Sequence, residues 1–184
     1  MMRVSRGSGR LYGVMLLLAA VVLLVDQLTK VWAVSALSDG ESVTVIPDLI
    51  RFRLLYNAGA AFSIGSGATW VFALAAAGAV AGMLYAARRL ASRGWALVLG
   101  LLLGGAVSHL GDRLFREPGF ARGHVVDFID YGAFVGNVAD IVLACGCAAL
   151  VLLCLRGVPF AEVPSEEPVI DAATARSGSA LPGE

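Results

Sequence analysis

Long apolar segments separated by polar stretches dominate the pattern of this chain. Four segments, at about 11–34, 69–87, 95–110 and 134–155, approach the roughly 20 mostly apolar residues that a membrane-spanning helix needs. The third is short, and its Gly104 and Gly105 favour a close approach by another helix. The pattern therefore predicts an all-α membrane protein with four transmembrane helices.

The polar stretch between the first two spans, residues 35–68, has a pattern of its own. Its segment "SVTVIPDLIRFRLLYN" alternates β-branched and polar residues, which predicts short strands in a small sheet, and its apolar content places that sheet against the membrane surface. Residues 161–184 are rich in Pro, Ser, Ala and Glu without periodicity, so we expect a disordered tail. Residues 1–160 then form a single membrane domain.

The distribution of Lys and Arg predicts the orientation of the spans. Arginines precede the first span, connect the second to the third, and follow the fourth, which favours both termini in the cytoplasm. The loops 35–68 and 111–133 are then extracytoplasmic. The first apolar segment is longer than a cleavable signal peptide requires, and we expect it to remain as a span.

Composition supports a membrane protein and excludes other classes. The chain is 58% hydrophobic and 15% charged, whereas a soluble domain carries about 25% charge. The net charge is zero and no basic motif with interleaved aromatic residues occurs, so nucleic-acid binding is not expected. Cys145, Cys147 and Cys154 lack C-x-x-C spacing and a nearby histidine. We expect them to be buried thiols packed against neighbouring helices, with no disulfide and no metal.

Most polar residues near the predicted outer ends of the spans have a structural interpretation. Asp26 and Lys30 are four residues apart, the spacing of an ion pair on one helix face. Asp112 beside Arg113 suggests a joint where the third span leaves the membrane. For Asn57, in a glycine-containing turn, we expect a backbone cap or bridge. Two further acids are expected to be solvated loop charges, Glu117 and Asp130.

Asp127 and Asp140 are the exceptions. Neither has a cation at helical spacing, and a short loop returns one towards the other. Two carboxylates at close range share one proton, so that one can accept a proton from water while the other protonates a leaving group. No H-E-x-x-H, G-x-S-x-G or P-loop motif competes with this pair. These residues predict a small membrane aspartyl hydrolase that needs no metal or other cofactor.

Five motifs also carry a family resemblance. "DQLTK", "YNAGAAFS", "GGAVSHLGDRL", "GHVVDFID" and "NVAD" occur in this order between about residues 14 and 156, and together they resemble the lipoprotein signal peptidase (signal peptidase II) family. The resemblance implies an intramembrane aspartyl protease of the bacterial cell (inner) membrane, with four spans and an extracytoplasmic β-cradle. Such enzymes remove the signal peptide from diacylglyceryl-modified prolipoproteins, just before the lipid-bearing cysteine. The implied partners are that substrate and membrane lipid, and we expect a monomer.

The resemblance also assigns roles to residues. It implies that Asp127 and Asp140 are catalytic. The family's supporting or substrate-binding polar residues match Asp26, Lys30, Asn57, Asp112, Arg113 and Asn137.

The chain departs from the family pattern at three positions. Ser108 and His109 stand where the family usually has Gly and Asn, and Gly136 stands where it usually has Phe before the motif asparagine. The loop between the two aspartates is also about one residue shorter than usual. We expect these departures to affect the rate or the pH optimum more than the type of reaction.

Two other interpretations stay open at the level of sequence. One is a non-enzymatic membrane protein that uses its acids as a proton relay or as docking points. The other is a peptidase homologue that has lost activity. The relay is disfavoured because the acids gather at one membrane face and no transporter-like internal repeat is evident.

Overall fold

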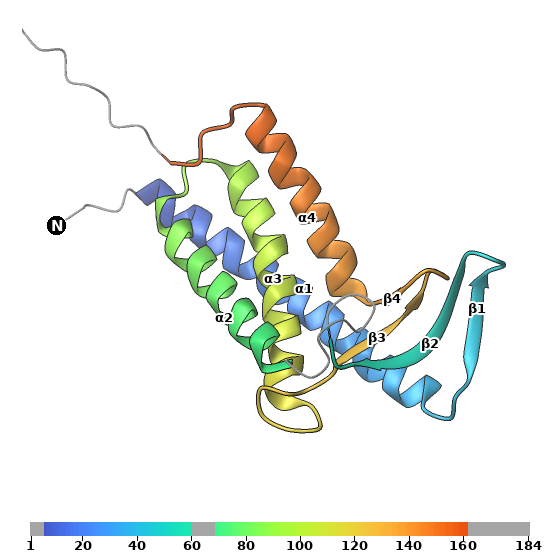
Figure 1. Cartoon of the computed structure of the whole chain (residues 1–184). Coiled ribbons are helices and arrows are strands. Elements are labelled where there is room, and N and C mark those ends of the chain that lie inside the picture. Colours follow the sequence, from blue (N-terminus) through green and yellow to red (C-terminus); the bar gives the residue numbers. More distant parts are fainter. Residues whose placement is uncertain (1–5, 60–68, 162–184) are drawn as a thin grey trace, which may run out of the picture.

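The computed structural model describes residues 6–59 and 69–161. Four helices within these residues are long and apolar enough to cross a membrane, as predicted. The amino end of the first and the carboxyl end of the last lie at the same end of the bundle (Figure 1). The helices are α1 (Arg6–Leu37), α2 (Thr69–Ala86), α3 (Arg93–Phe115) and α4 (Val138–Leu155).

A small antiparallel sheet lies beyond the other end of the helices (Figure 1). Its strand order is β1-β2-β3-β4. Outside the sheet, a short 3-10 helix, η3 (Ala87–Arg89), follows α2. The first two strands confirm the sheet predicted for the first loop. No strand was expected for the other two: β3 comes from the second loop, and β4 lies at the start of the predicted fourth span. The strands are β1 (Ser42–Ile46), β2 (Ile50–Asn57), β3 (Val125–Asp130) and β4 (Val135–Gly136).

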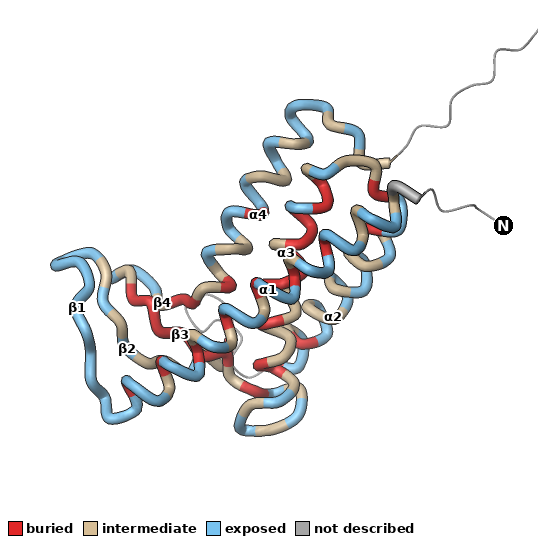
Figure 2. Tube along the Cα trace, turned by 180° about the vertical axis from the view of Figure 1, so that it is seen from behind, coloured by how far each residue is buried: buried red, intermediate tan, exposed pale blue. Residues whose placement is uncertain are grey.

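Helix α3 is the centre of the bundle, and the other three helices pack against it. Figure 2 shows buried residues along much of its length, while α1 and α4 are mostly exposed. A Cβ atom on Gly104 would lie 2.6 Å from Val22 Cβ, and one on Gly105 would lie 2.7 Å from Leu143 Cγ. The two glycines therefore let α1 and α4 approach α3 closely, as their sequence context predicted.

Several helix boundaries differ from the predicted spans, and α1 (Arg6–Leu37) is longer at both ends than the predicted 11–34. Helix α3 continues to Phe115, beyond the predicted end at residue 110, because the polar side chains of its last turns are buried with partners inside the protein. Helix α4 begins at Val138, whereas the predicted span began at residue 134. The side chain of Asn137 accepts a hydrogen bond from Asp140 N and caps the helix at this point.

The expectation that the three cysteines are buried is wrong. Cys145, Cys147 and Cys154 are exposed on α4. In a membrane protein the outer surface of a helix is as apolar as its packed face, so an apolar segment does not reveal which of its side chains point inwards. The predicted tail at 161–184, apart from residue 161, lies outside the described residues, and so does most of the "GAAFS" segment, at 60–68.

Candidate active site

A buried network of charges joins α1 to α3 just below the sheet. Lys30 Nζ lies 2.6 Å from Asp26 Oδ2 and 2.7 Å from Asp112 Oδ2, and the lysine is fully buried. Arg116 Nε lies 2.6 Å from Asp112 Oδ1. The predicted pairing of Asp26 with Lys30 is confirmed, whereas the partners of Asp112 are Lys30 and Arg116 and not the adjacent Arg113. Each buried charge is therefore compensated.

The same network holds the first turn of α4. Asp26 Oδ1 accepts a hydrogen bond of 2.7 Å from Ala139 N, and its Oδ2 accepts one of 2.5 Å from Ser108 Oγ. Gln27 Nε2 donates to Ser108 Oγ at 2.8 Å and to Asp112 Oδ1 at 3.0 Å. The unusual Ser108 is thus accommodated by two hydrogen bonds, and the network joins α1, α3 and α4 at one level.

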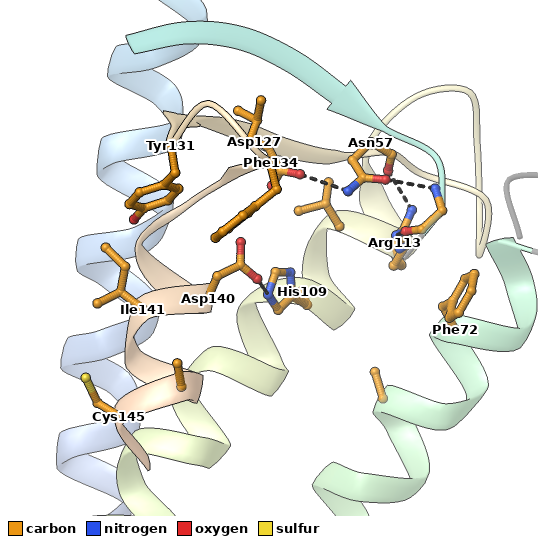
Figure 3. A pocket seen from close by; sticks show the side chains of 15 residues that line it. Asn57, Phe72, His109, Arg113, Asp127, Tyr131, Phe134, Asp140, Ile141 and Cys145 are labelled. Atoms are coloured by element: carbon orange, nitrogen blue, oxygen red, sulfur yellow. Dashed lines mark hydrogen bonds and ion pairs between the residues drawn. The ribbon is translucent and has the colours of Figure 1, made fainter. Parts of the chain in front are cut away.

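Asp127 lies on β3 with only 2% of its surface exposed. Its Oδ1 accepts a hydrogen bond of 2.6 Å from Asn137 Nδ2, and its Oδ2 accepts one of 2.9 Å from Asn57 Nδ2 (Figure 3). Burial raises the pKa of Asp127 to about 6, against the opposing effect of the two amide donors, and the negative charge of Asp140 raises it further. This carboxyl group therefore keeps its proton to a higher pH than an ordinary aspartate does.

Asp140 lies in the first turn of α4 and forms a capping box with Asn137. Its Oδ2 accepts a hydrogen bond of 2.9 Å from Asn137 N, while Asn137 Oδ1 accepts one of 3.1 Å from Asp140 N. Its Oδ1 lies 3.1 Å from His109 Nε2. Asn137 thus contacts both acids, and His109 contacts Asp140.

Asn57 and Arg113 hold the end of β2 beside Asp127. Asn57 Oδ1 accepts a hydrogen bond of 3.0 Å from Gly59 N, which confirms its expected role in bridging backbone, and its amide also reaches Asp127. The buried Arg113 guanidinium donates to the carbonyl oxygens of Asn57 at 2.9 Å and of Gly123 at 3.1 Å, and also to that of Gly59. Arg113 therefore holds the backbone at the end of β2 against the backbone that precedes β3.

Asp127 and Asp140 line one pocket of about 630 Å³, into which His109 and Arg113 also face (Figure 3). Its walls are mostly apolar: α2 supplies one side and α4 the other. Such a cavity can accept an apolar segment and place a polar bond beside the two acids. The apolar lining includes Phe72, Ala76, Tyr131, Phe134, Ile141, Ala144 and Cys145. Across residues 6–59 and 69–161, no group of three or more His, Cys, Asp or Glu side chains is arranged to hold a metal ion.

The expectation that Asp130 is a solvated loop charge is wrong. Only 3% of its surface is exposed, and its Oδ2 lies 2.7 Å from Arg53 Nε and 3.3 Å from Arg51 Nε. Hydrogen bonding from Arg53 holds the pKa of Asp130 below its ordinary value. The signal was present in the alternation "RFR", which puts two arginines on one face of β2. Glu117 is exposed, as expected.

Comparison with known proteins decides the family. A family model described as signal peptidase (SPase) II matches residues 18–156. The chain belongs to the signal peptidase II family. Family membership makes it a membrane peptidase, of the aspartic type by family, and sets aside the interpretation as a non-enzymatic proton relay.

Curated relatives of the family cover most of the chain. The lipoprotein signal peptidase of Mycolicibacterium smegmatis is 49% identical over 159 residues, which are 86% of this chain and 68% of the relative. That of Bifidobacterium longum subsp. infantis is 48% identical, with 77% and 78% covered. That of Mycobacterium leprae is 47% identical, with 88% and 81% covered.

Two solved structures share the fold. Both are described as bacterial membrane enzyme structures obtained by the in meso method, at 2.3 and 1.9 Å resolution. Each has a TM-score of 0.67 and the sequence identities are 27% and 28%. The matches cover 82% and 78% of this chain and 94% of each solved chain. The four helices with a small sheet are therefore the fold of known membrane enzymes.

Proposed function

We propose that this enzyme cuts diacylglyceryl-modified prolipoproteins just before the lipid-bearing cysteine, with Asp127 and Asp140 as the catalytic pair. One observation carries the proposal. Strand β3 and helix α4, joined by a short hairpin, bring two acids into the same pocket, and the acids face no lysine or arginine at ion-pair distance among the described residues.

The chemistry follows from the different surroundings of the two acids. Asp127, whose pKa is raised to about 6, holds the shared proton, and Asp140 is the charged partner. Water attacks the scissile carbonyl carbon, Asp140 takes the proton that the water loses, and Asp127 gives its proton to the carbonyl oxygen. Asp140 then protonates the leaving amine as the carbon–nitrogen bond breaks, and Asp127 recovers a proton as the carboxylic acid forms.

The apolar walls fit a substrate that arrives from the bilayer. Phe72 on α2 and Ile141 on α4 face the pocket from opposite sides, at the level where both helices are still apolar. The signal segment and the acyl chains of a lipid-modified precursor are apolar too, so they lose little by moving from lipid into such a cleft. Because both acids belong to one chain, a monomer suffices.

The positions of the arginines support an extracytoplasmic site. Arg88, Arg89 and Arg93 join α2 to α3, and Arg156 follows α4, all at the end of the bundle opposite the sheet. Under the positive-inside rule this end is cytoplasmic. Both termini then face the cytoplasm, and the pocket opens near the outer surface of the membrane.

The test is cleavage of a lipid-modified precursor peptide by the purified protein in detergent. The wild type should cut before the modified cysteine. Asp127→Asn and Asp140→Asn should each reduce kcat by at least about 100-fold, because an amide cannot exchange the proton at the required step. Glu117→Gln, which neutralises an exposed loop acid, is the matched control and should retain full activity.

The outcomes separate the remaining interpretations. An inactive wild type would favour the degenerate homologue. Normal turnover in either aspartate variant would refute the assignment of the catalytic pair while leaving the peptidase in place.

A further inference from the structure

A tight turn between β3 and β4 presents two aromatic rings to the pocket. The rings of Tyr131 and Phe134 stack with centroids 4.8 Å apart and an angle of 28° between their planes. Tyr131 N donates a hydrogen bond of 2.9 Å to Phe134 O, and Gly132 between them has a φ of 82°, which favours glycine. Both rings line the pocket that contains the dyad (Figure 3).

The aromatic pair stands directly beside Asp140. A Cβ atom on Gly136 would lie 2.9 Å from Asp140 Oδ2 and 3.4 Å from Phe134 Cε2. The ring of Phe134 and the carboxylate therefore border the same small space, which the missing side chain of Gly136 leaves open. Burial raises the pKa of Tyr131, and the negative charge of Asp140 adds to this effect.

Asp130 fixes this turn from behind. Its Oδ1 accepts a hydrogen bond of 2.8 Å from Gly132 N, in the middle of the turn, while its Oδ2 is held by Arg53 at 2.7 Å. Arg51 lies farther away, at 3.3 Å, and is more exposed. The carboxylate thus ties the tip of the β3–β4 turn to β2, and the two aromatic rings are carried on a braced support.

We infer that Tyr131 and Phe134 form a specificity wall that limits the size of the residue preceding the lipid-bearing cysteine, and that Asp130 with Arg53 positions this wall. The inference rests on the proposed function. The cysteine carries two acyl chains, which need the apolar path between α2 and α4 to reach the bilayer. The residue that precedes the cysteine is on the other side of the scissile bond. It must then lie between Asp140 and the ring of Phe134, where the space is small.

The experiment compares two lipid-modified peptides that differ only in the residue before the cysteine, glycine or valine. The readout is the ratio of their kcat/KM values, because loss of folded enzyme lowers both rates equally and cancels. The wild type should prefer glycine. Phe134→Ala should reduce that preference by about tenfold or more, since hydrophobic pockets discriminate single methylene groups by about tenfold. Phe134→Leu, which keeps apolar bulk at the site, should reduce it less and serves if the alanine variant does not fold.

Two neighbouring arginines provide a matched pair for the positioning role. Arg53→Gln should relax the preference by about two- to fivefold, the range expected for a partly exposed ion pair. Arg51→Gln is the same change two residues away, at a longer contact, and should leave the ratio nearly unchanged.

Each possible result supports or contradicts a stated part of the inference. An unchanged ratio in both Phe134 variants would overturn the wall. Equal effects of the two arginine variants would overturn the positioning role of Asp130 with Arg53. A wild type that cleaves neither peptide would overturn the proposed function and this inference with it, whereas an active wild type with unaltered variants overturns only the inference.

Discussion

Two clusters of carboxylates lie at the same end of the helix bundle, and they differ in what faces them. In the α1–α3 network, Asp26 and Asp112 are paired with a buried lysine at 2.6 and 2.7 Å. In the pocket, Asp127 faces two neutral amides, and Asp140 faces a backbone amide and a histidine. A lysine compensates the carboxylates of the first cluster, whereas those of the second have no lysine or arginine at ion-pair distance among the described residues and can exchange a proton.

This contrast shows that burial alone does not identify a reactive acid. Asp112 and Asp127 are almost equally buried, yet one is compensated and the other is not. A compensated acid stabilises the fold and cannot readily take up a proton, while an uncompensated one costs stability and can. The two clusters should therefore respond with opposite signs when a charge is removed.

The largest effect is expected in the compensated network. Asp112→Ala leaves Lys30 with one partner and Arg116 with none of its present carboxylate contact, so the folded protein should lose about 3–5 kcal/mol of stability. Unfolding of purified protein in detergent and the amount of protein in membranes measure this loss. A variant that is fully stable yet inactive would move Asp112 from the structural network to the catalytic group.

The opposite sign is expected in the pocket. The pKa of Asp127 is raised to about 6 in the folded protein, compared with about 3.9 when unfolded. The folded state thus binds the proton more tightly, and stability falls as pH rises from about 4 to 6 and stays low above that. Asp127→Asn removes this cost but loses one hydrogen bond, so at pH 8 it should be more stable by about 2 kcal/mol.

The gain in Asp127→Asn should disappear near pH 4, where the wild-type carboxyl is protonated in the folded state and about half protonated in the unfolded state. Thermal unfolding at the two pH values measures the difference, and Glu117→Gln, at an exposed position, controls for a general effect of losing one negative charge. Equal stabilisation at both pH values would show that the effect does not come from the titration of Asp127.

The smallest effect is expected at His109, which contacts Asp140 in the pocket. A protonated His109 would put a cation 3.1 Å from Asp140 Oδ1, and the pocket would then resemble the compensated network. Because the dyad must keep one proton, such a cation should lower activity in acidic solution. His109→Asn cannot carry this charge, so it should retain a few-fold more activity than the wild type at acidic pH, without loss at neutral pH. Superimposable pH–activity profiles of the two proteins would leave His109 as a plain hydrogen-bonding residue.

The sequence predicted the spans well because the apolar segments are long and contain few charged residues. It also predicted the pairing of Asp26 with Lys30, whose spacing along one helix determines their contact. The grouping of Asp127 with Asp140 followed from the short loop between them. Local spacing was sufficient for each of these features.

What the sequence did not predict depends on contacts between distant segments. Asp130 is held by an arginine 77 residues earlier, and Ser108 donates to an aspartate 82 residues earlier. No spacing rule connects such positions before the sheet and the helix bundle form. The exposure of Cys147 on α4 was missed for another reason, since lipid and protein interior are equally apolar surroundings.

The capping box at the start of α4 makes the orientation of the Asp140 carboxylate depend on the geometry of the helix. Asp140 Oδ2 accepts from Asn137 N, so the same carboxylate that serves the dyad also closes the first turn of the helix. Its orientation is set as the helix forms, with no separate side-chain search. The hairpin between β3 and β4 can change in length without disturbing this cap. A single residue inserted between Asn137 and Asp140 would break both capping hydrogen bonds and also turn the Asp140 carboxylate away from the pocket. The first turn of α4 therefore tolerates no change in length, and a change in length of this region must fall in the hairpin before it.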